Sequence, residues 1–199
     1  MTQLSRTPEM NITTDETIIA ATKLWLERAV IGLNLCPFAK NVHVKNQIRY
    51  VVSNATTHED LLRDLMRELE VLAETPAVKI DTTLLIHPYV LTDFFEYNDF
   101  LDITDAALED MDLEGALQVA SFHPQYQFDG TQPDDIENYT NRSPYPMMHL
   151  LREASMVQAV SAFPETEKIF DKNIETLRCL GHAGWNDLGL VQATPPLKK

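Results

Sequence analysis

The pattern that most constrains the fold is an alternation of short apolar runs, rich in β-branched residues, with helix-length segments. Three runs are predicted to be strands, over 48–53, 80–87 and 116–123. The segments between them, 56–75 and 93–110, begin with capping residues and repeat apolar residues at helical spacing. Strand–helix–strand connections of this length favour parallel pairing. We therefore predict an α/β fold with a small three-stranded, mainly parallel sheet; a two-layer α+β sheet is the alternative.

A further helix is predicted before the first strand. Thr13 and Glu16 form a capping box, and apolar residues recur at helical spacing as far as residue 35. Cys36-Pro37 ends this helix, because the residue before a proline avoids helical dihedral angles. An irregular segment to about residue 45 is expected to lead into the first strand.

Two more helices are predicted after the third strand and a polar loop over 125–142. Ser143-Pro144 is an N-cap followed by proline at the first helical position, and it predicts a helix over 143–163. A last helix is expected over 165–180, with Gly181 as its C-cap.

The chain is expected to fold as one domain. Its 199 residues are enough for a single sizeable core and too few to make two domains the default. We assign 13–190 to a globular domain, 1–12 to a flexible N-terminus and 191–199 to a disordered tail.

The net charge of −14 is concentrated in one part of the chain. Residues 80–141 contain 14 acidic residues and no Lys or Arg, while the other 16 acidic residues balance the 16 Lys and Arg. Such a negative balance argues against non-specific nucleic-acid binding. A solvated acidic face is the simplest interpretation, and docking of a basic protein partner through 93–114 is the alternative.

Other features of the sequence predict a cytoplasmic protein. No stretch approaches the roughly 18 apolar residues of a membrane-spanning helix, and the N-terminus lacks the apolar core of a secretory signal. The two cysteines, Cys36 and Cys179, are too few for a disulfide framework, which fits a reducing compartment. No membrane partner is therefore expected.

The candidate site follows from a repeated dipeptide. His87-Pro88 and His123-Pro124 end the second and third predicted strands. Carboxyl ends of parallel strands lie at one edge of a sheet, where open α/β sheets bind ligands. We expect His87 and His123 to serve there as a catalytic acid and base. Hydrogen bonding that merely closes the strand ends is the alternative.

An anion-binding group is predicted beside these histidines. The helix expected from Ser143 would bring its N-terminus to the same edge, where free N–H groups favour negative charge. Asn141, Arg142 and Ser143 are therefore candidates to bind an anionic small substrate, together with Arg152 on the same helix. Arg142 could instead pair with an acidic residue of its own loop.

The same helix suggests a metal site. His149 and Glu153 are four residues apart and would share one helix face, and with His123 they could bind zinc, iron or manganese. A surface ion pair is the alternative for His149 and Glu153. Tyr126 and Tyr145 fall near the same edge and are candidate catalytic residues, unless they only pack the long loop.

Cys36 is a separate candidate, as a nucleophile or a thiolate metal ligand. It follows the predicted C-terminus of a helix, where the dipole does not lower the pKa of a thiol. Its apolar neighbours favour a buried, unreactive thiol instead.

Three stretches of the chain are distinctive: GLNLCPFA over 32–39, FHPQYQF over 122–128, and NYTNRSPYP running into HLLRE over 138–153. Together they resemble a largely bacterial family of unknown function, DUF1415. The resemblance covers most of the chain and implies an intracellular single-domain protein. It implies no reaction, but it includes the Cys36 segment and both stretches chosen above.

Four hypotheses for function follow. The first is an enzyme that acts on a small anionic substrate by histidine acid/base chemistry or by metal-assisted hydrolysis or group transfer. The others are a non-catalytic ligand-binding or regulatory module in the same cleft, a thiol or metal–thiolate protein using Cys36, and an interaction protein that uses the acidic helix over 93–110.

Overall fold

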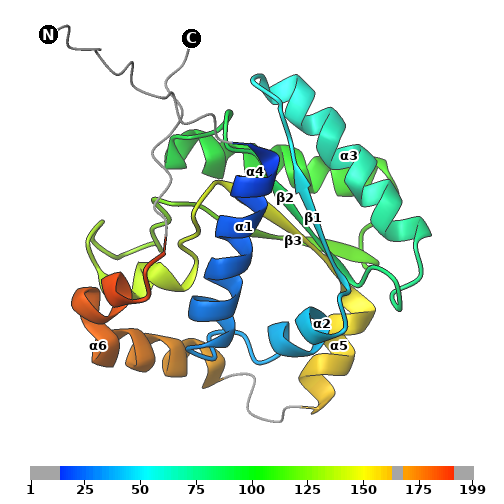
Figure 1. Cartoon of the computed structure of the whole chain (residues 1–199). Coiled ribbons are helices and arrows are strands. Elements are labelled where there is room, and N and C mark those ends of the chain that lie inside the picture. The colour runs from blue at the N-terminus through cyan, green and yellow to red at the C-terminus, as the bar shows by residue number, and fades with distance from the viewer. Residues whose placement is uncertain (1–13, 163–167, 191–199) are drawn as a thin grey trace, which may run out of the picture.

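Four strands form one sheet in the computed structural model, which describes residues 14–162 and 168–190 (Figure 1). The strands lie in the order β1 (Ile48–Val52), β2 (Thr82–Ile86), β4 (Met147–Arg152) and β3 (Leu117–Phe122). β1 pairs with β2 in parallel, and β4 runs antiparallel to both β2 and β3. The α/β class is confirmed, but the prediction of three mainly parallel strands is wrong.

The fourth strand, β4, is the element that the sequence patterns did not indicate. Its residues, MMHLLR, include several good helix formers and no β-branched residue, and they were predicted to be helical from Ser143 onward. The segment nevertheless fills the gap between β2 and β3, where Met147, Met148 and Leu150 are fully buried. Strand pairing and burial on both faces therefore override local propensity. The helix α5 (Glu153–Ala162) begins only where β4 ends.

The direction of β4 also places the carboxyl ends of β2 and β3 at the same edge of the sheet. Because β4 is antiparallel to both neighbours, β2 and β3 run in the same direction although they do not touch. Their carboxyl ends share one edge of the sheet with the start of β4, here called the histidine edge. The expected juxtaposition of two strand ends is therefore correct, and the expected direct pairing of the two strands is not.

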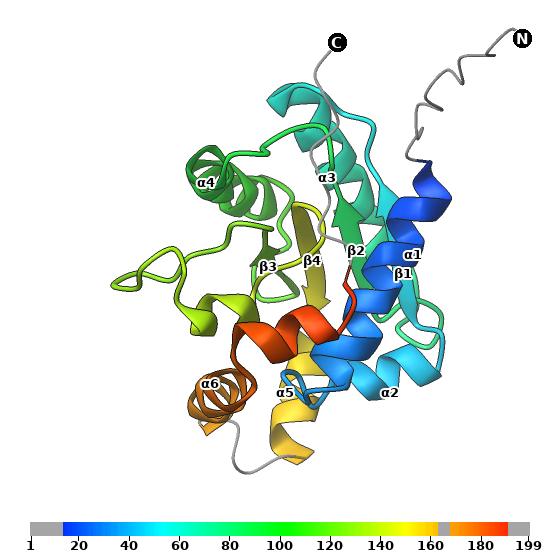
Figure 2. The same ribbon diagram turned by 60° about the vertical axis from the view of Figure 1, so that its left-hand side comes forward.

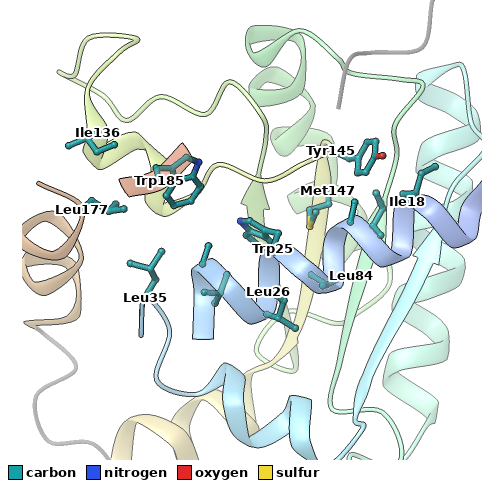
Figure 3. Packing of buried hydrophobic residues seen from close by; sticks show 14 residues of the cluster. Ile18, Trp25, Leu26, Leu35, Leu84, Ile136, Tyr145, Met147, Leu177 and Trp185 are labelled. Carbon is teal, nitrogen blue, oxygen red and sulfur yellow. The ribbon is translucent and has the colours of Figure 1, made fainter. Parts of the chain in front are cut away.

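One face of the sheet is covered by helices from both ends of the chain (Figures 1 and 2). α1 (Asp15–Trp25) continues into a π-helix, η1 (Leu26–Ile31), and α6 (Ile169–Asp187) packs beside them. Figure 3 shows the side chains that fill this layer around the tryptophans of α1 and α6. This face is called the α1 face below.

The opposite face is covered by α3 (His58–Glu74) and α4 (Phe94–Asp110) and is called the α3–α4 face. α3 is strongly amphipathic, and its four fully buried leucines form one stripe: Leu61, Leu65, Leu69 and Leu72. In cores of this kind, truncating one leucine to alanine costs about 2–5 kcal/mol. Helices therefore lie on both faces, in contrast to the two-layer alternative.

Three helix starts, those of α1, α3 and α4, agree with the capping signals to within a residue. Thr14, not Thr13, caps α1, and Thr57 caps α3 one residue later than predicted. Asp93 caps α4 as predicted, since its carboxylate accepts hydrogen bonds from the backbone N–H groups of Phe95 and Glu96. Thr13 itself falls outside the described residues.

Several shorter elements differ from the prediction. α2 (Ala39–Val44) lies in the segment expected to be irregular, and the long polar loop contains a 3₁₀-helix, η2 (Ile136–Thr140). Gly181 breaks α6 with a positive φ of 62°, but helical structure resumes after it and reaches Asp187. The predicted flexible N-terminus, the disordered tail and residues 163–167 lie outside the described residues.

Within the described part of the chain, every helix is too short or too polar to cross a bilayer.

Candidate functional site

His87 and His123 both lie at the histidine edge, on the α3–α4 face. Each imidazole packs against the ring of Tyr97 from α4, with centroids 5.7 Å away for His87 and 5.2 Å for His123. Both histidines are 0% exposed. The structure thus brings the two predicted acid/base residues together around Tyr97, for which the sequence pattern indicates only a place in a helix.

Both nitrogens of His123 have hydrogen-bond partners. Nε2 lies 3.2 Å from the carbonyl oxygen of Leu91, which can only accept, so Nε2 carries a proton. Nδ1 accepts a hydrogen bond from the backbone N–H of Gln125 at 3.0 Å, so Nδ1 is unprotonated. His123 is therefore a neutral imidazole whose hydrogen-bonding capacity is fully used by the backbone.

His87 has only one partner. Its Nδ1 lies 3.0 Å from the carbonyl oxygen of Val90 and must therefore donate. Nε2 is buried and has no hydrogen-bond partner, one of three such side-chain atoms among the described residues. In the neutral ring this nitrogen carries a lone pair. Leaving a buried acceptor unsatisfied costs about 1–3 kcal/mol, so the atom calls for an explanation.

The environment keeps both imidazoles uncharged. Burial, with a smaller contribution from the nearby His123, lowers the pKa of His87 from 6.5 to about 4, against the opposing effect of the Val90 carbonyl. Burial likewise lowers the pKa of His123 to about 4, against the opposing effects of the Leu91 carbonyl and Asp93. Neutral histidines are therefore present throughout the physiological pH range.

The two histidines hold one short loop between β2 and α4. His87 donates to the carbonyl of Val90 and His123 donates to that of the next residue, Leu91. Leu91 is 2% exposed and has a φ of 53°, a left-handed conformation that is rare for a leucine. Such conformations cost of order 1–3 kcal/mol and persist only where the surroundings enforce them. The site thus includes a strained backbone segment that no glycine in the sequence signals.

Aromatic rings extend from the histidines toward the surface. Tyr97 is buried, and its hydroxyl donates to the carbonyl of Met147 and accepts from the backbone N–H of Phe122. Phe94, which is only partly buried, lies 5.5 Å from the His123 ring and 5.1 Å from the ring of Tyr126. Tyr126 is therefore near the histidines, as predicted.

The residues predicted to bind an anion donate their hydrogen bonds to carbonyl groups of the protein itself. Arg142 donates from Nε to the carbonyl of Tyr126 and from an Nη to that of Pro133, and its guanidinium stacks 4.4 Å from the ring centre of Tyr139. Asn141 donates to the carbonyl of Ser121, and the Ser143 hydroxyl donates to that of Tyr145. No helix begins at Ser143, so the expected helix dipole is absent there.

Tyr145 lies near the histidine edge but on the other face of the sheet, and Arg152 lies at the opposite edge. Tyr145 is buried on the α1 face beside Ile18, and burial raises its pKa (Figure 3). Arg152 ends β4 at the opposite edge, where its guanidinium donates to the carbonyls of Leu72, Thr75 and Ile80. This cation therefore stabilises the C-terminus of α3, where the helix dipole is negative.

The residues proposed to bind a metal are dispersed. His149 sits in the middle of β4, and its Nε2 lies 2.7 Å from the hydroxyl of Thr82, which itself donates to the carbonyl of Leu150. Burial lowers the pKa of His149 to about 4. Glu153 lies beyond the end of β4, at the edge opposite His123. Over 14–162 and 168–190, no three His, Cys, Asp or Glu side chains gather in a way that could hold a metal ion.

Cys36 packs against the core of the α1 face, and burial raises the pKa of its thiol despite hydrogen bonds from Phe38 and Ala39. A raised pKa disfavours the reactive thiolate.

The acidic helix α4 exposes its carboxylates to solvent, among them Glu96, Asp99 and Asp102. Its use by a basic partner stays a prediction.

The fold and site define a mixed α/β protein with a buried, neutral histidine pair at one edge of its sheet. The family model described as "Protein of unknown function (DUF1415)" matches residues 17–187. The chain belongs to this family, as its three motifs indicated. Neither the comparison with curated proteins nor that with solved structures gave a match.

Proposed function

We propose that this protein is an enzyme that acts on a small molecule at the histidine edge, with His87 as its proton-transfer residue. The observation that carries the proposal is the buried, unpartnered Nε2 of His87. A substrate O–H or N–H group that reached this atom would satisfy it. The catalytic role of His87 was predicted from the His-Pro dipeptides. The proposal assigns that role to Nε2 of this histidine.

The geometry supports proton transfer at Nε2. The hydrogen bond from Nδ1 to the Val90 carbonyl fixes the tautomer and would stabilise the imidazolium that forms when Nε2 takes a proton. Tyr97, stacked at 15° to the His87 ring, limits its rotation. Hydrolysis or group transfer, in which a nucleophile loses a proton, is the reaction class that such a residue serves.

The proposal omits two features expected from the sequence. Metal assistance by His123, His149 and Glu153 is left out, because the three residues do not come together. Anion binding by Arg142 is left out, because backbone carbonyls and a tyrosine ring occupy its guanidinium. The prediction of an anionic substrate depended on Arg142 and loses its main support.

A non-catalytic ligand-binding module is the second candidate. The observation in its favour is the low basicity of His87, whose pKa of about 4 makes it a weak general base near neutral pH. The same lone pair would then accept a hydrogen bond from a ligand without taking the proton.

The test compares two substitutions, each of which keeps the donor to the loop carbonyl. His87→Asn places an amide nitrogen where Nδ1 was, so the bond to Val90 can be kept while Nε2 is removed. His123→Gln keeps a donor for Leu91 and serves as the matched control. We would screen a metabolite library for ligands by thermal shift and follow the hits for turnover by NMR.

An enzyme requires hits that wild type and His123→Gln convert and His87→Asn does not. Binding without conversion would favour the ligand-binding module. Equal binding and turnover by all three proteins would contradict any role for Nε2 of His87.

A further inference from the structure

We infer that the ligand of the histidine edge is a planar, uncharged nitrogen heterocycle that presents an N–H group to His87. This inference rests on the proposed function and specifies its ligand. Three observations carry it: the acceptor on His87, the aromatic rings packed around the histidine pair, and the engagement of Arg142 by other groups.

The acceptor defines the hydrogen-bonding half of the ligand. Nε2 of His87 is unprotonated because Nδ1 must donate to Val90. A carboxylate or phosphate oxygen would face this nitrogen lone pair to lone pair and gain no hydrogen bond. An N–H group satisfies it directly. The site therefore selects donors and rejects anions.

The surroundings define the shape of the ligand. Phe94 is stacked at 24° to Tyr97 with centroids 6.5 Å apart, and it also contacts the ring of Tyr126. Phe94 and Tyr126 are both partly exposed, whereas Tyr97 is fully buried. A flat ring can pack among such side chains, and each aromatic pair adds about 2- to 10-fold in affinity.

Charge is excluded by the same surroundings. Burial of an unpaired charge is far more costly than burial of a neutral polar group. Arg142 could pair with an anion, but its guanidinium already donates to the carbonyls of Tyr126 and Pro133 and stacks on Tyr139. Asp93, whose charge acts on His123, would repel an anion. A neutral heterocycle is the class that fits all three conditions.

The experiment uses the full chain and three probes of similar size. Benzimidazole has the N–H group, 1-methylbenzimidazole lacks it, and benzoate is a planar anion. Binding is followed by chemical-shift changes in wild type, His87→Asn and the control His123→Gln. The comparison of the first two probes is made on wild type alone and does not depend on how any variant folds.

We expect wild type to bind benzimidazole about tenfold or more tightly than 1-methylbenzimidazole, and benzoate not at all. In His87→Asn the ratio of the first two affinities should fall to about one, and in His123→Gln it should persist. Equal binding of the two heterocycles by wild type, preferential binding of benzoate, or no binding of any probe would each overturn the inferred ligand class.

These outcomes are separable from those of the proposed function. Benzoate binding combined with turnover that is lost in His87→Asn would overturn the ligand class and leave the enzyme standing. Selective binding of benzimidazole without turnover of any related heterocycle would support the ligand class and contradict the enzyme.

Discussion

His87 and His123 occupy equivalent positions but differ in the hydrogen bonds of their ring nitrogens. Each follows a strand, precedes a proline, is fully buried and packs on Tyr97. His123 uses both ring nitrogens to bind backbone groups, whereas His87 uses one and leaves Nε2 without a partner. The difference shows that the same His-Pro dipeptide can place a purely structural histidine at the end of one strand and a histidine with an unused nitrogen at the end of another.

The largest expected effect is the loss of stability at low pH, which follows from the lowered pKa values of both histidines. Their pKa values of about 4 lie below the unfolded value of 6.5. Between these values the unfolded chain binds more protons than the native one, so the free energy of unfolding falls as pH drops from 6.5 to 4. For each histidine this loss reaches about 3 kcal/mol at low pH, and it is absent above pH 6.5.

Urea unfolding at a series of pH values measures this loss. His123→Gln and His87→Asn should each make the decline between pH 6.5 and 4 shallower, because each removes one buried titrating group. A decline that is unchanged in both variants would show that these imidazoles do not carry the pH dependence.

The next effect is a difference in stability between the alanine variants of the two histidines. His123→Ala removes two hydrogen bonds and leaves a cavity, and it should cost about 3 kcal/mol of unfolding free energy. His87→Ala removes one hydrogen bond together with an unsatisfied atom, so it should cost about 1 kcal/mol less. Denaturant melts at pH 7 provide both values. A larger cost at His87 would mean that its Nε2 is not idle in the folded state.

A smaller effect contrasts the histidine edge with the opposite edge. Arg152→Met removes the donors to the carbonyls of Leu72, Thr75 and Ile80 and should cost about 2 kcal/mol. Because β4 separates this arginine from the histidines by its full length, probe binding should stay at the wild-type level. Loss of binding in a variant that remains folded would restore the predicted ligand role of Arg152.

The smallest effect on stability belongs to His87→Asn. With the bond to Val90 retained, the free energy of unfolding should stay within about 1 kcal/mol of wild type at pH 7. Binding of benzimidazole should nevertheless lose its preference over the methylated probe. A variant that loses several kcal/mol would indicate that His87 has a structural role like that of His123.

The sequence predicted the parts of this fold that depend on local pattern. Strands β1, β2 and β3, helices α1, α3 and α4 and the two histidines at one edge follow from apolar periodicity, capping residues and proline positions. β4 could not be predicted this way, because its Met and Leu residues favour a helix in isolation and become a strand only between β2 and β3.

That one error explains most of what was missed at the site. A helix from Ser143 would have grouped His149, Arg152 and Glu153 on one surface, whereas the strand spreads them along the sheet. The role of Tyr97 and the strained Leu91 depend on contacts between distant segments. The unpartnered nitrogen of His87 is likewise a property of packing, and no residue pattern could indicate it.

The most direct test of the central claim is the tautomeric state of the two histidines, read from the imidazole nitrogens by NMR at pH 7. The structure predicts opposite neutral forms: His87 protonated on Nδ1 with a free Nε2, and His123 protonated on Nε2 with an acceptor at Nδ1. Benzimidazole should then shift Nε2 of His87 and leave the tautomer of His123 unchanged. A proton on Nε2 of His87 in the free protein would contradict the account, because the acceptor on which the site depends would not exist.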